Sequence, residues 1–455
     1  MIQALEAINK FIWGVPALTL ILGVGLYLTI RTKFAQFRLF PQAISDFCRQ
    51  FTKGEENHSG ISPYQALCTA LAATVGTGNL AGVAGAIAIG GPGAIFWMWV
   101  CALFGMVTKF AEATLAVCYR IKNKDGEFVG GPMYMIQEGL GKKWKWLASV
   151  YCFFGVVASF GVGNATQINT VINGISSTVA YFGGQMSNRW NVVLGIGLAV
   201  LICVMLLGGA KRIGIAAEKL VPFVSAAYLF LCIFVLILRL DRIPDALSAI
   251  VYGAFSPRAV TGGMLGSSFS ALRIGASRGV FTNEAGMGTA SIAHASAQVE
   301  HPVKQGLMGI MEVFLDTIVI CTMTALVILC SGVQIPYGED CGVILTVDAF
   351  SAVCGDWSCI PITLALCCFA VATVLGWGLY GIRCAQYLFG ENTWKTFAIA
   401  QGAMVVLGAI LNTQTVWMLS ECVNGLMAMP NLLALAWLSP ELIKLTVEYR
   451  KGPTK

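Results

Sequence analysis

Long apolar runs alternate with short polar or charged segments along the whole chain. Eleven such runs cover residues 11–31, 62–90, 93–119, 147–179, 190–208, 213–239, 260–297, 303–332, 358–388, 393–412 and 415–438. A transmembrane helix needs about 20 predominantly apolar residues, and most of these runs supply them. The residue-by-residue alternation of a membrane β-barrel is absent. The pattern therefore predicts an all-α integral membrane protein with about 11 transmembrane helices.

The composition agrees with this class. The 455 residues are 57% hydrophobic and only 11% charged, with a mean hydropathy of +0.74. Since soluble domains carry about 25% charged residues, the composition excludes a soluble enzyme, a disordered protein and a nucleic-acid binder. The sequence has no phosphate-binding G-x-x-x-x-G-K-[ST] loop, and its three His are too dispersed for a metal cage, so we expect no cofactor. Cys341 and Cys354 lie in the polar segment 333–357, where either a disulfide or two free thiols is open.

Lys and Arg are divided unequally between the segments that join the runs. With the N-terminus placed outside, 21 of the 29 Lys and Arg residues fall on the cytoplasmic side and five on the outer side. Loops on the cytoplasmic side of membrane proteins are enriched in these residues. We therefore expect a multi-pass protein of the plasma (inner) membrane, with the N-terminus outside and the C-terminus in the cytoplasm.

Two runs contain glycine and small polar residues near the depth of the bilayer centre. The first includes Thr74-Val-Gly-Thr-Gly-Asn-Leu-Ala-Gly82, and the second includes Gly279-Val-Phe-Thr-Asn-Glu-Ala-Gly286. Both contain Asn-x-Ala-Gly, and each opens a block of five runs, so that the second block is inverted relative to the first. Paired interrupted helices of this kind indicate a binding site near the membrane midplane. The alternative is that the glycines serve only close helix packing.

The chemistry of an interrupted helix suggests what binds there. Unwinding leaves backbone N–H and C=O groups that cost several kcal/mol each if they stay unpaired in lipid. Half-helix N-termini suit a carboxylate, whereas half-helix C-termini and free carbonyl groups suit a small cation such as Na⁺. Side-chain oxygens are available from Thr74, Thr77, Asn79, Thr282 and Asn283. The two breaks therefore favour a zwitterionic amino acid together with a small cation.

Glu284 is the charged residue within the second break. A carboxylate at this depth is costly and indicates function. Three roles are open for it: neutralising a substrate ammonium, carrying a proton, or pairing with Arg273 or Arg278. We favour the last, a structural or gating role for Glu284 and Arg278.

Two further pairs of charged residues lie one helical turn apart within the runs. Lys109 and Glu112 are expected to pair with each other. Glu312 and Asp316 have like charges, so either one is protonated or a basic group such as Arg273 lies near them.

Three stretches resemble the signature sequences of the sodium:alanine symporter family. They are the Thr74–Gly82 segment, Arg278-Gly-Val-Phe-Thr-Asn-Glu-Ala-Gly286 and Gly376-Trp-x-x-Tyr-Gly381, and the resemblance covers essentially the whole chain. It implies a leucine-transporter-like fold, with one extra N-terminal helix before two inverted repeats of five helices. The implied divisions are 1–60 for the N-terminal helix and basic segment, 61–240 and 241–440 for the repeats, and 441–455 for a cytoplasmic tail.

The resemblance also implies a function and a site. The function is uptake of a small neutral amino acid, most often alanine or glycine, driven by Na⁺. The substrate site would comprise Gly76, Gly78, Gln167, Phe281, Thr282, Thr373 and Trp377. One Na⁺ would lie between Ala72, Val75 and Thr373, and a second near Thr74 and Asn79. This chain departs from the family pattern in having Thr282 where Ser is frequent, and in lacking an acid shortly after Trp377.

Other functions stay open at this level. The first is an H⁺-coupled symporter of the same fold that carries serine or glutamine. A passive facilitator would not accumulate its substrate, and a membrane-embedded enzyme would need a catalytic cluster that the dispersed His residues do not supply. Because Phe281 and Trp377 would make the pocket small, we expect alanine or glycine to be preferred over leucine.

Overall fold

The computed structural model describes residues 9, 11–53, 60–124, 126–256, 268–339, 341–411 and 413–451. The beginning of the predicted run 260–297 and the end of the predicted tail 441–455 lie outside these residues. The described chain is almost entirely helical. The two strands within the described residues are β1 (Ile121–Lys122) and β2 (Phe128–Val129), which pair antiparallel.

The first half of the chain contains both short surface helices and long apolar ones. In order, these are α2 (Val15–Arg31), α3 (Ala35–Arg38), α4 (Phe40–Lys53), α5 (Pro63–Thr74), α6 (Val83–Gly90), α7 (Gly93–Cys118), α8 (Pro132–Tyr134), α9 (Lys145–Phe160), α10 (Thr166–Tyr181), α11 (Asn188–Leu206) and α12 (Gly209–Leu238). A π-helical turn over Gly78–Gly82 leads directly into α6, and another over Gly161–Ala165 joins α9 to α10.

The second half repeats this alternation. Its helices are α13 (Ile243–Phe255), α15 (Ser268–Asn283), α16 (Thr289–His294), α17 (Pro302–Val313), α18 (Thr322–Ser331), α19 (Val343–Cys354), α20 (Cys359–Phe389), α21 (Trp394–Gly408) and α22 (Thr413–Lys451). A π-helical stretch over Phe314–Cys321 joins α17 to α18, so that they form one continuous span.

Seven helical stretches of the described chain are long and apolar enough to cross a membrane, and the bent pair of α5 and α6 makes an eighth. Each of the eleven predicted runs coincides with a helix or an interrupted helix. However, α2, α21 and the pair α15–α16 are too short to be counted among the helices that are long enough to cross a membrane. The protein is therefore a multi-pass helical membrane protein. The number of spans stays a prediction.

Several short helices lie outside the predicted runs, and α13 and α19 are two of them. α13 has only 13 residues and falls between predicted runs, and α19 has 12 residues and lies within the polar segment 333–357. Both are shorter than a membrane span, so a search for runs of about 20 apolar residues does not detect them. No disulfide joins Cys341 to Cys354 in the structure.

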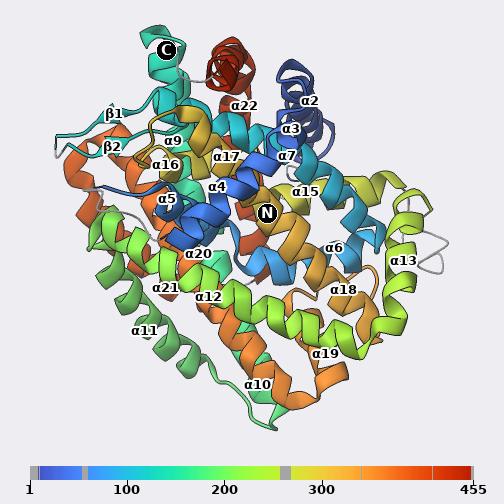
Figure 1. The fold of residues 1–455 in the computed structure, drawn as a ribbon. Helices are drawn as coiled ribbons and strands as arrows, with labels where there is room; N and C mark the ends of the chain where they lie inside the picture. Colours follow the sequence, from blue (N-terminus) through green and yellow to red (C-terminus); the bar gives the residue numbers. More distant parts are fainter. Residues whose placement is uncertain are drawn as a thin grey trace.

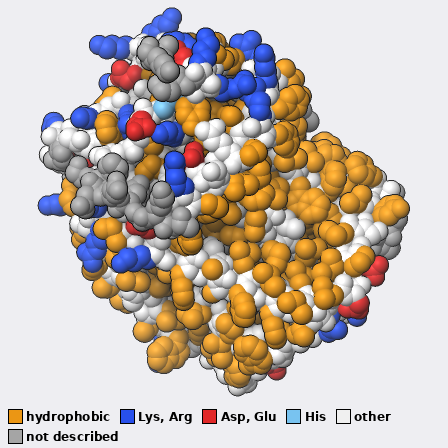
Figure 2. All heavy atoms as spheres, in the orientation of Figure 1, with side chains coloured by type: hydrophobic (Ala, Val, Ile, Leu, Met, Phe, Trp, Pro, Cys, Tyr) orange, Lys and Arg blue, Asp and Glu red, His pale blue; other side chains and the backbone are white. Residues whose placement is uncertain are grey.

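The arrangement of the helices separates a buried centre from an apolar periphery. α7 packs against α15 and α17, and α20 packs against α9, α10 and α12, whereas α11 and α13 lie at the edges of the molecule (Figure 1). Phe223 and Phe230 of α12 are 74% and 69% exposed, as expected of lipid-facing side chains. Figure 2 shows Lys and Arg gathered at the top and left of the face in view, with apolar side chains over most of the rest.

Candidate functional site

The first predicted break is present between α5 and α6. α5 begins with a capping box, in which the Ser62 hydroxyl accepts from the Gln65 amide and the Gln65 side chain accepts from the Ser62 amide. It ends at Thr74, because Val75 adopts an extended conformation, and the two halves are bent by 52°. Asn79 stabilises the turn: its Oδ1 accepts a hydrogen bond of 2.9 Å from the amide of Gly76.

The break diverts backbone groups away from helical pairing. The Gly76 amide, which would pair with the Ala72 carbonyl in a continuous helix, donates to Asn79 instead. The Thr77 amide donates to Oε1 of Gln167 on α10 at 3.3 Å. The carbonyl groups of Ala72 and Ala73 are consequently without their helical partners. The hydroxyl of Thr77 is also buried without a hydrogen-bond partner.

The predicted substrate residues converge on this break. Gly76 faces Thr373 of α20 and Gln167 so closely that an added methyl group would overlap the Thr373 hydroxyl. Gly78 faces Thr282 and Phe281 of α15, and a methyl group there would lie 2.9 Å from the Cγ2 of Thr282. The fold therefore brings together residues that are up to 297 positions apart in the sequence, and the two glycines allow α20 and α15 to pack closely against the break.

The second break lies between α15 and α16. The backbone of Glu284, Gly286 and Gly288 has positive φ angles of 53°, 95° and 77°, a conformation that glycine adopts readily and Glu does not. Oε1 of Glu284 accepts a hydrogen bond of 2.6 Å from the indole nitrogen of Trp377, and Oε2 accepts one of 2.5 Å from the Thr289 hydroxyl. Trp377, one turn beyond Thr373 on α20, thus reaches the second break.

The expected pairing of Glu284 with Arg273 or Arg278 is not formed. Arg278 instead makes an ion pair of 3.0 Å with Glu421 of α22. Arg278 lies six residues before Glu284, so that the two side chains leave the chain in different directions, and α15 ends between them. Glu284 contacts Trp377 of α20, and no ion pair between Glu284 and a basic residue of α15 is present among the described residues.

The two pairs of charged residues contact further partners besides those that were expected. Lys109 lies 3.9 Å from Glu112, as predicted, but it lies closer, at 3.3 Å, to Glu312 of α17. The basic neighbour of Glu312 is therefore Lys109 and not Arg273. Asp316 has polar partners instead, since it accepts hydrogen bonds from Asn79 at 2.7 Å and from the Thr317 hydroxyl at 2.8 Å.

The residues predicted to hold Na⁺ surround the end of α5. Ala72, Thr74, Val75, Asn79 and Thr373 are all buried there. The Thr373 hydroxyl donates to the carbonyl of Phe369 at 3.0 Å, which leaves its oxygen lone pairs facing the break. Backbone carbonyl and hydroxyl oxygens are the ligands that hard cations prefer, so this set of residues fits a small cation.

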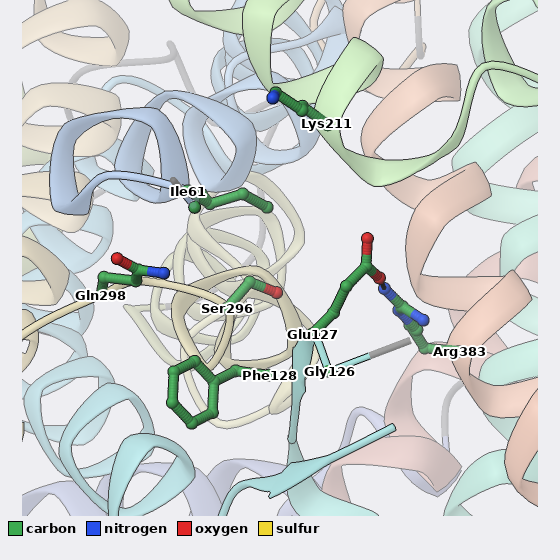
Figure 3. A pocket seen from close by; sticks show the side chains of 9 residues that line it. Ile61, Gly126, Glu127, Phe128, Lys211, Ser296, Gln298 and Arg383 are labelled. Carbon is green, nitrogen blue, oxygen red and sulfur yellow. Dashed lines mark hydrogen bonds and ion pairs between the residues drawn. The ribbon is translucent and has the colours of Figure 1, made fainter. Parts of the chain in front are cut away.

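A cavity at the far ends of the two broken helices was not foreseen. It has a volume of about 240 Å³ and lies between the start of α5, the segment after α16, the β1–β2 hairpin and α20 (Figure 3). Glu127 and Arg383 point toward each other on its wall and form an ion pair of 3.2 Å. Beside the cavity, the backbone amide of Gln298 donates to the backbone carbonyl of Ile61 at 2.9 Å, and this bond joins the two broken helices.

Comparisons with known proteins agree with this architecture. The model of the sodium:alanine symporter family matches residues 1–455. The sodium/alanine symporter AgcS of Methanococcus maripaludis is 40% identical over 100% of this chain and 99% of its own length. An uncharacterized transporter of Haemophilus influenzae is 43% identical over 98% of this chain and 95% of its own length.

One solved structure shows the fold. The crystal structure of MhsT in complex with L-phenylalanine superposes with a TM-score of 0.58 at 16% identity, and covers 87% of this chain and 99% of MhsT. Together with the family match, the paired helix breaks and the apolar periphery lead to one conclusion. The chain belongs to the sodium:alanine symporter family, whose members are amino-acid transporters and not enzymes.

Proposed function

We propose that the protein takes up a small neutral amino acid, alanine or glycine, together with Na⁺ by alternating access. The observation that carries this proposal is the packing of the first helix break against α15 and α20, where Gly78 faces Thr282 and Gly76 faces Thr373. The break leaves the carbonyl groups of Ala72 and Ala73 without their helical partners and the Thr77 hydroxyl without a hydrogen bond, and a zwitterionic substrate with a cation would pair with both kinds of group.

The substrate carboxylate would bind at the first break. Gly76 and Gly78 have no side chain that would cover the backbone of the break. The unpartnered hydroxyl of Thr77 and the amide group of Gln167 are further polar groups at this position. Phe281 and the fully buried Trp377 are large neighbours, and they favour a substrate with a short side chain.

The coupling Na⁺ would bind at the C-terminal end of α5. Its ligands would be carbonyl groups near Ala72 and Val75 together with the Thr373 hydroxyl. A second Na⁺ near Thr74 and Asn79 has weaker support, because the Asn79 oxygen already accepts from the Gly76 amide and its side-chain nitrogen donates to Asp316.

The two halves of the chain would form inverted repeats. In 61–240, a broken helix is followed by four long helical stretches, and the same order holds in 241–440 when α13 and α19 are set aside. α2 would be the extra N-terminal helix. The gathered Lys and Arg residues would then lie on the cytoplasmic side with the C-terminus, and the cavity beside Glu127 and Arg383 would face the cytoplasm.

A second candidate is H⁺-coupled transport of serine or glutamine. Its support is Asp316, a fully buried carboxylate that touches Asn79 of the first break and forms no ion pair within the described chain. Among the relatives, the probable sodium/glutamine symporter GlnT of Bacillus subtilis is 37% identical over 99% of this chain and 92% of its own length, which supports glutamine as a substrate but not H⁺ coupling.

Equilibrium binding tests the substrate and the ion together. Purified protein should bind radiolabelled alanine in a NaCl buffer and should lose that binding when K⁺ replaces Na⁺ at the same ionic strength. Binding of similar affinity in both salts would contradict the proposed Na⁺ site. Binding that requires acidic pH and not Na⁺ would favour the H⁺-coupled alternative.

A further inference from the structure

A cluster of fully buried charged residues lies beside the second break, outside the predicted substrate site. Lys109 and Glu112 come from α7, His294 from α16 and Glu312 from α17, and each has no exposed surface. The Lys109 ammonium lies between the two carboxylates, 3.3 Å from Oε1 of Glu312 and 3.9 Å from Oε2 of Glu112. The cluster thus connects three helices in the centre of the bundle.

Glu112 contacts the backbone of the second break directly. Its Oε1 accepts hydrogen bonds from the amides of Gly286 at 2.9 Å and Gly288 at 3.0 Å, and from Nδ2 of Asn431 at 2.7 Å. Gly288 is the residue that caps the N-terminus of α16. The carboxylate therefore pairs with amides that a continuous helix would have bonded internally, at the end of the helix where a negative charge is favoured.

The opposite end of α16 is held by Glu312. Oε2 of Glu312 lies 2.8 Å from Nε2 of His294, and the Nδ1 of the same imidazole lies 2.7 Å from the side-chain nitrogen of Gln305. A neutral imidazole satisfies both contacts, with Nε2–H as the donor to Glu312 and Nδ1 as the acceptor from Gln305. Lys109 is then the cation that balances both glutamates.

The cluster has a direct connection to the predicted substrate site. The segment that Glu112 holds begins with Glu284, whose carboxylate binds the indole of Trp377. Thr282, two residues earlier, faces Gly78 of the first break. A displacement of the Gly286 and Gly288 backbone would therefore move two groups that line the predicted pocket.

We propose that Glu112 is a positioning residue for substrate binding, which holds the second break in its binding geometry. This inference rests on the proposed function, because its main readout is alanine transport. Glu112 does not touch the substrate. It acts through the amides of Gly286 and Gly288, and Lys109 couples it to Glu312, so that α16 stays attached to α7 and α17.

The test compares transport by variants in proteoliposomes. Glu112→Ala removes the acceptor and should raise the KM for alanine about tenfold, because the hydrogen bonds that hold the Gly286 and Gly288 amides are lost. Glu112→Gln keeps an acceptor oxygen and should raise the KM less. Glu312→Gln is the matched comparison, because it removes a charge beside Lys109 without touching the second break, and it should affect the KM less than Glu112→Ala. Glu300→Gln, at an exposed site, should behave as wild type.

Hydrogen exchange provides a second measurement that does not depend on the Ala variant folding. In the wild-type protein the amides of Gly286 and Gly288 should exchange slowly, and in Glu112→Gln they should exchange faster while α7 and α17 stay protected. Rapid exchange in the wild type, or a wild-type KM in a folded Glu112→Ala protein, would overturn the inference. Absence of alanine transport by the wild type itself would instead count against the proposed function.

Discussion

The indole nitrogen of Trp377 on α20 donates a hydrogen bond of 2.6 Å to the carboxylate of Glu284 in the second helix break. Both side chains are buried, with exposed fractions of 1% and 2%. Trp has a single hydrogen-bond donor, the indole N–H. In this structure that group donates to Glu284, whose backbone has a positive φ angle. The contact joins the helix that carries Thr373 to the segment that carries Thr282, so the wall of the predicted pocket is one connected unit.

Replacing Trp377 tests this connection. Trp377→Phe keeps an aromatic ring but leaves Oε1 of Glu284 without its donor, which costs about 1–3 kcal/mol for a buried group. We expect the KM for alanine to rise about tenfold, and Trp377→Ala to weaken uptake further, with both proteins still inserted in the membrane. Uptake kinetics and the amount of protein in isolated membranes provide the measurement. Unchanged kinetics in Trp377→Ala would mean that the indole serves packing alone.

The close approach at Gly76 predicts a strict requirement for glycine. A methyl group at this position would overlap the Thr373 hydroxyl and would lie 3.3 Å from the Gln167 side chain. Gly76→Ala should therefore reduce uptake to background. The matched control is Gly197→Ala on α11, where nothing lies within 4 Å of the added methyl group and Ala is favoured by about 1 kcal/mol in a helix. Near-normal uptake by Gly76→Ala would show that the first break is not part of the substrate site.

Variants of Asn79 and Asp316 distinguish a structural role of these two residues from a role in ion coupling. Asn79→Ala removes the acceptor for the Gly76 amide and the donor to Asp316, and should raise the Na⁺ concentration for half-maximal uptake about tenfold. Asp316→Asn keeps an oxygen that can accept from Asn79, so Na⁺-driven uptake should persist in this variant. If Asp316→Asn abolished uptake while the protein stayed folded, a proton-carrying role for Asp316 would replace the Na⁺ account.

The size of the pocket predicts the order of competing substrates. Unlabelled alanine, glycine and leucine, added separately, should inhibit labelled alanine uptake with leucine the weakest. One added methylene group changes the binding free energy by only about 1–3 kcal/mol, so alanine and glycine should differ by a preference and not absolutely. Equal competition by leucine and alanine would contradict a pocket bounded by Phe281 and Trp377.

Local patterns predicted the parts of the structure that depend on neighbours along the chain. The shared Asn-x-Ala-Gly located both breaks, because glycine and small polar residues interrupt an apolar run in a way that is visible in the sequence. The spacing of Lys109 and Glu112 by three residues predicted their contact. Short helices such as α13 were not predicted, since 13 residues are too few to form an apolar run of the length of a membrane span.

Contacts between distant segments could not be derived in the same way. Glu284 has several potential partners in the sequence, and nothing local distinguishes Arg278, six residues away, from Trp377, which is 93 residues away. The same holds for Lys109 and Glu312, and for His294, which drew no attention as an isolated residue. The packing of α7, α16, α17 and α20 decides these pairs, and that packing is a property of the whole fold.

Gradient-driven uptake tests the central claim most directly. Proteoliposomes should be loaded so that an inward gradient of Na⁺, K⁺ or H⁺ is imposed separately, and radiolabelled alanine should then be followed over time. The account predicts accumulation above the equilibrium level with the Na⁺ gradient alone. Accumulation driven by H⁺ without Na⁺, or uptake that never exceeds equilibrium under any gradient, would contradict it.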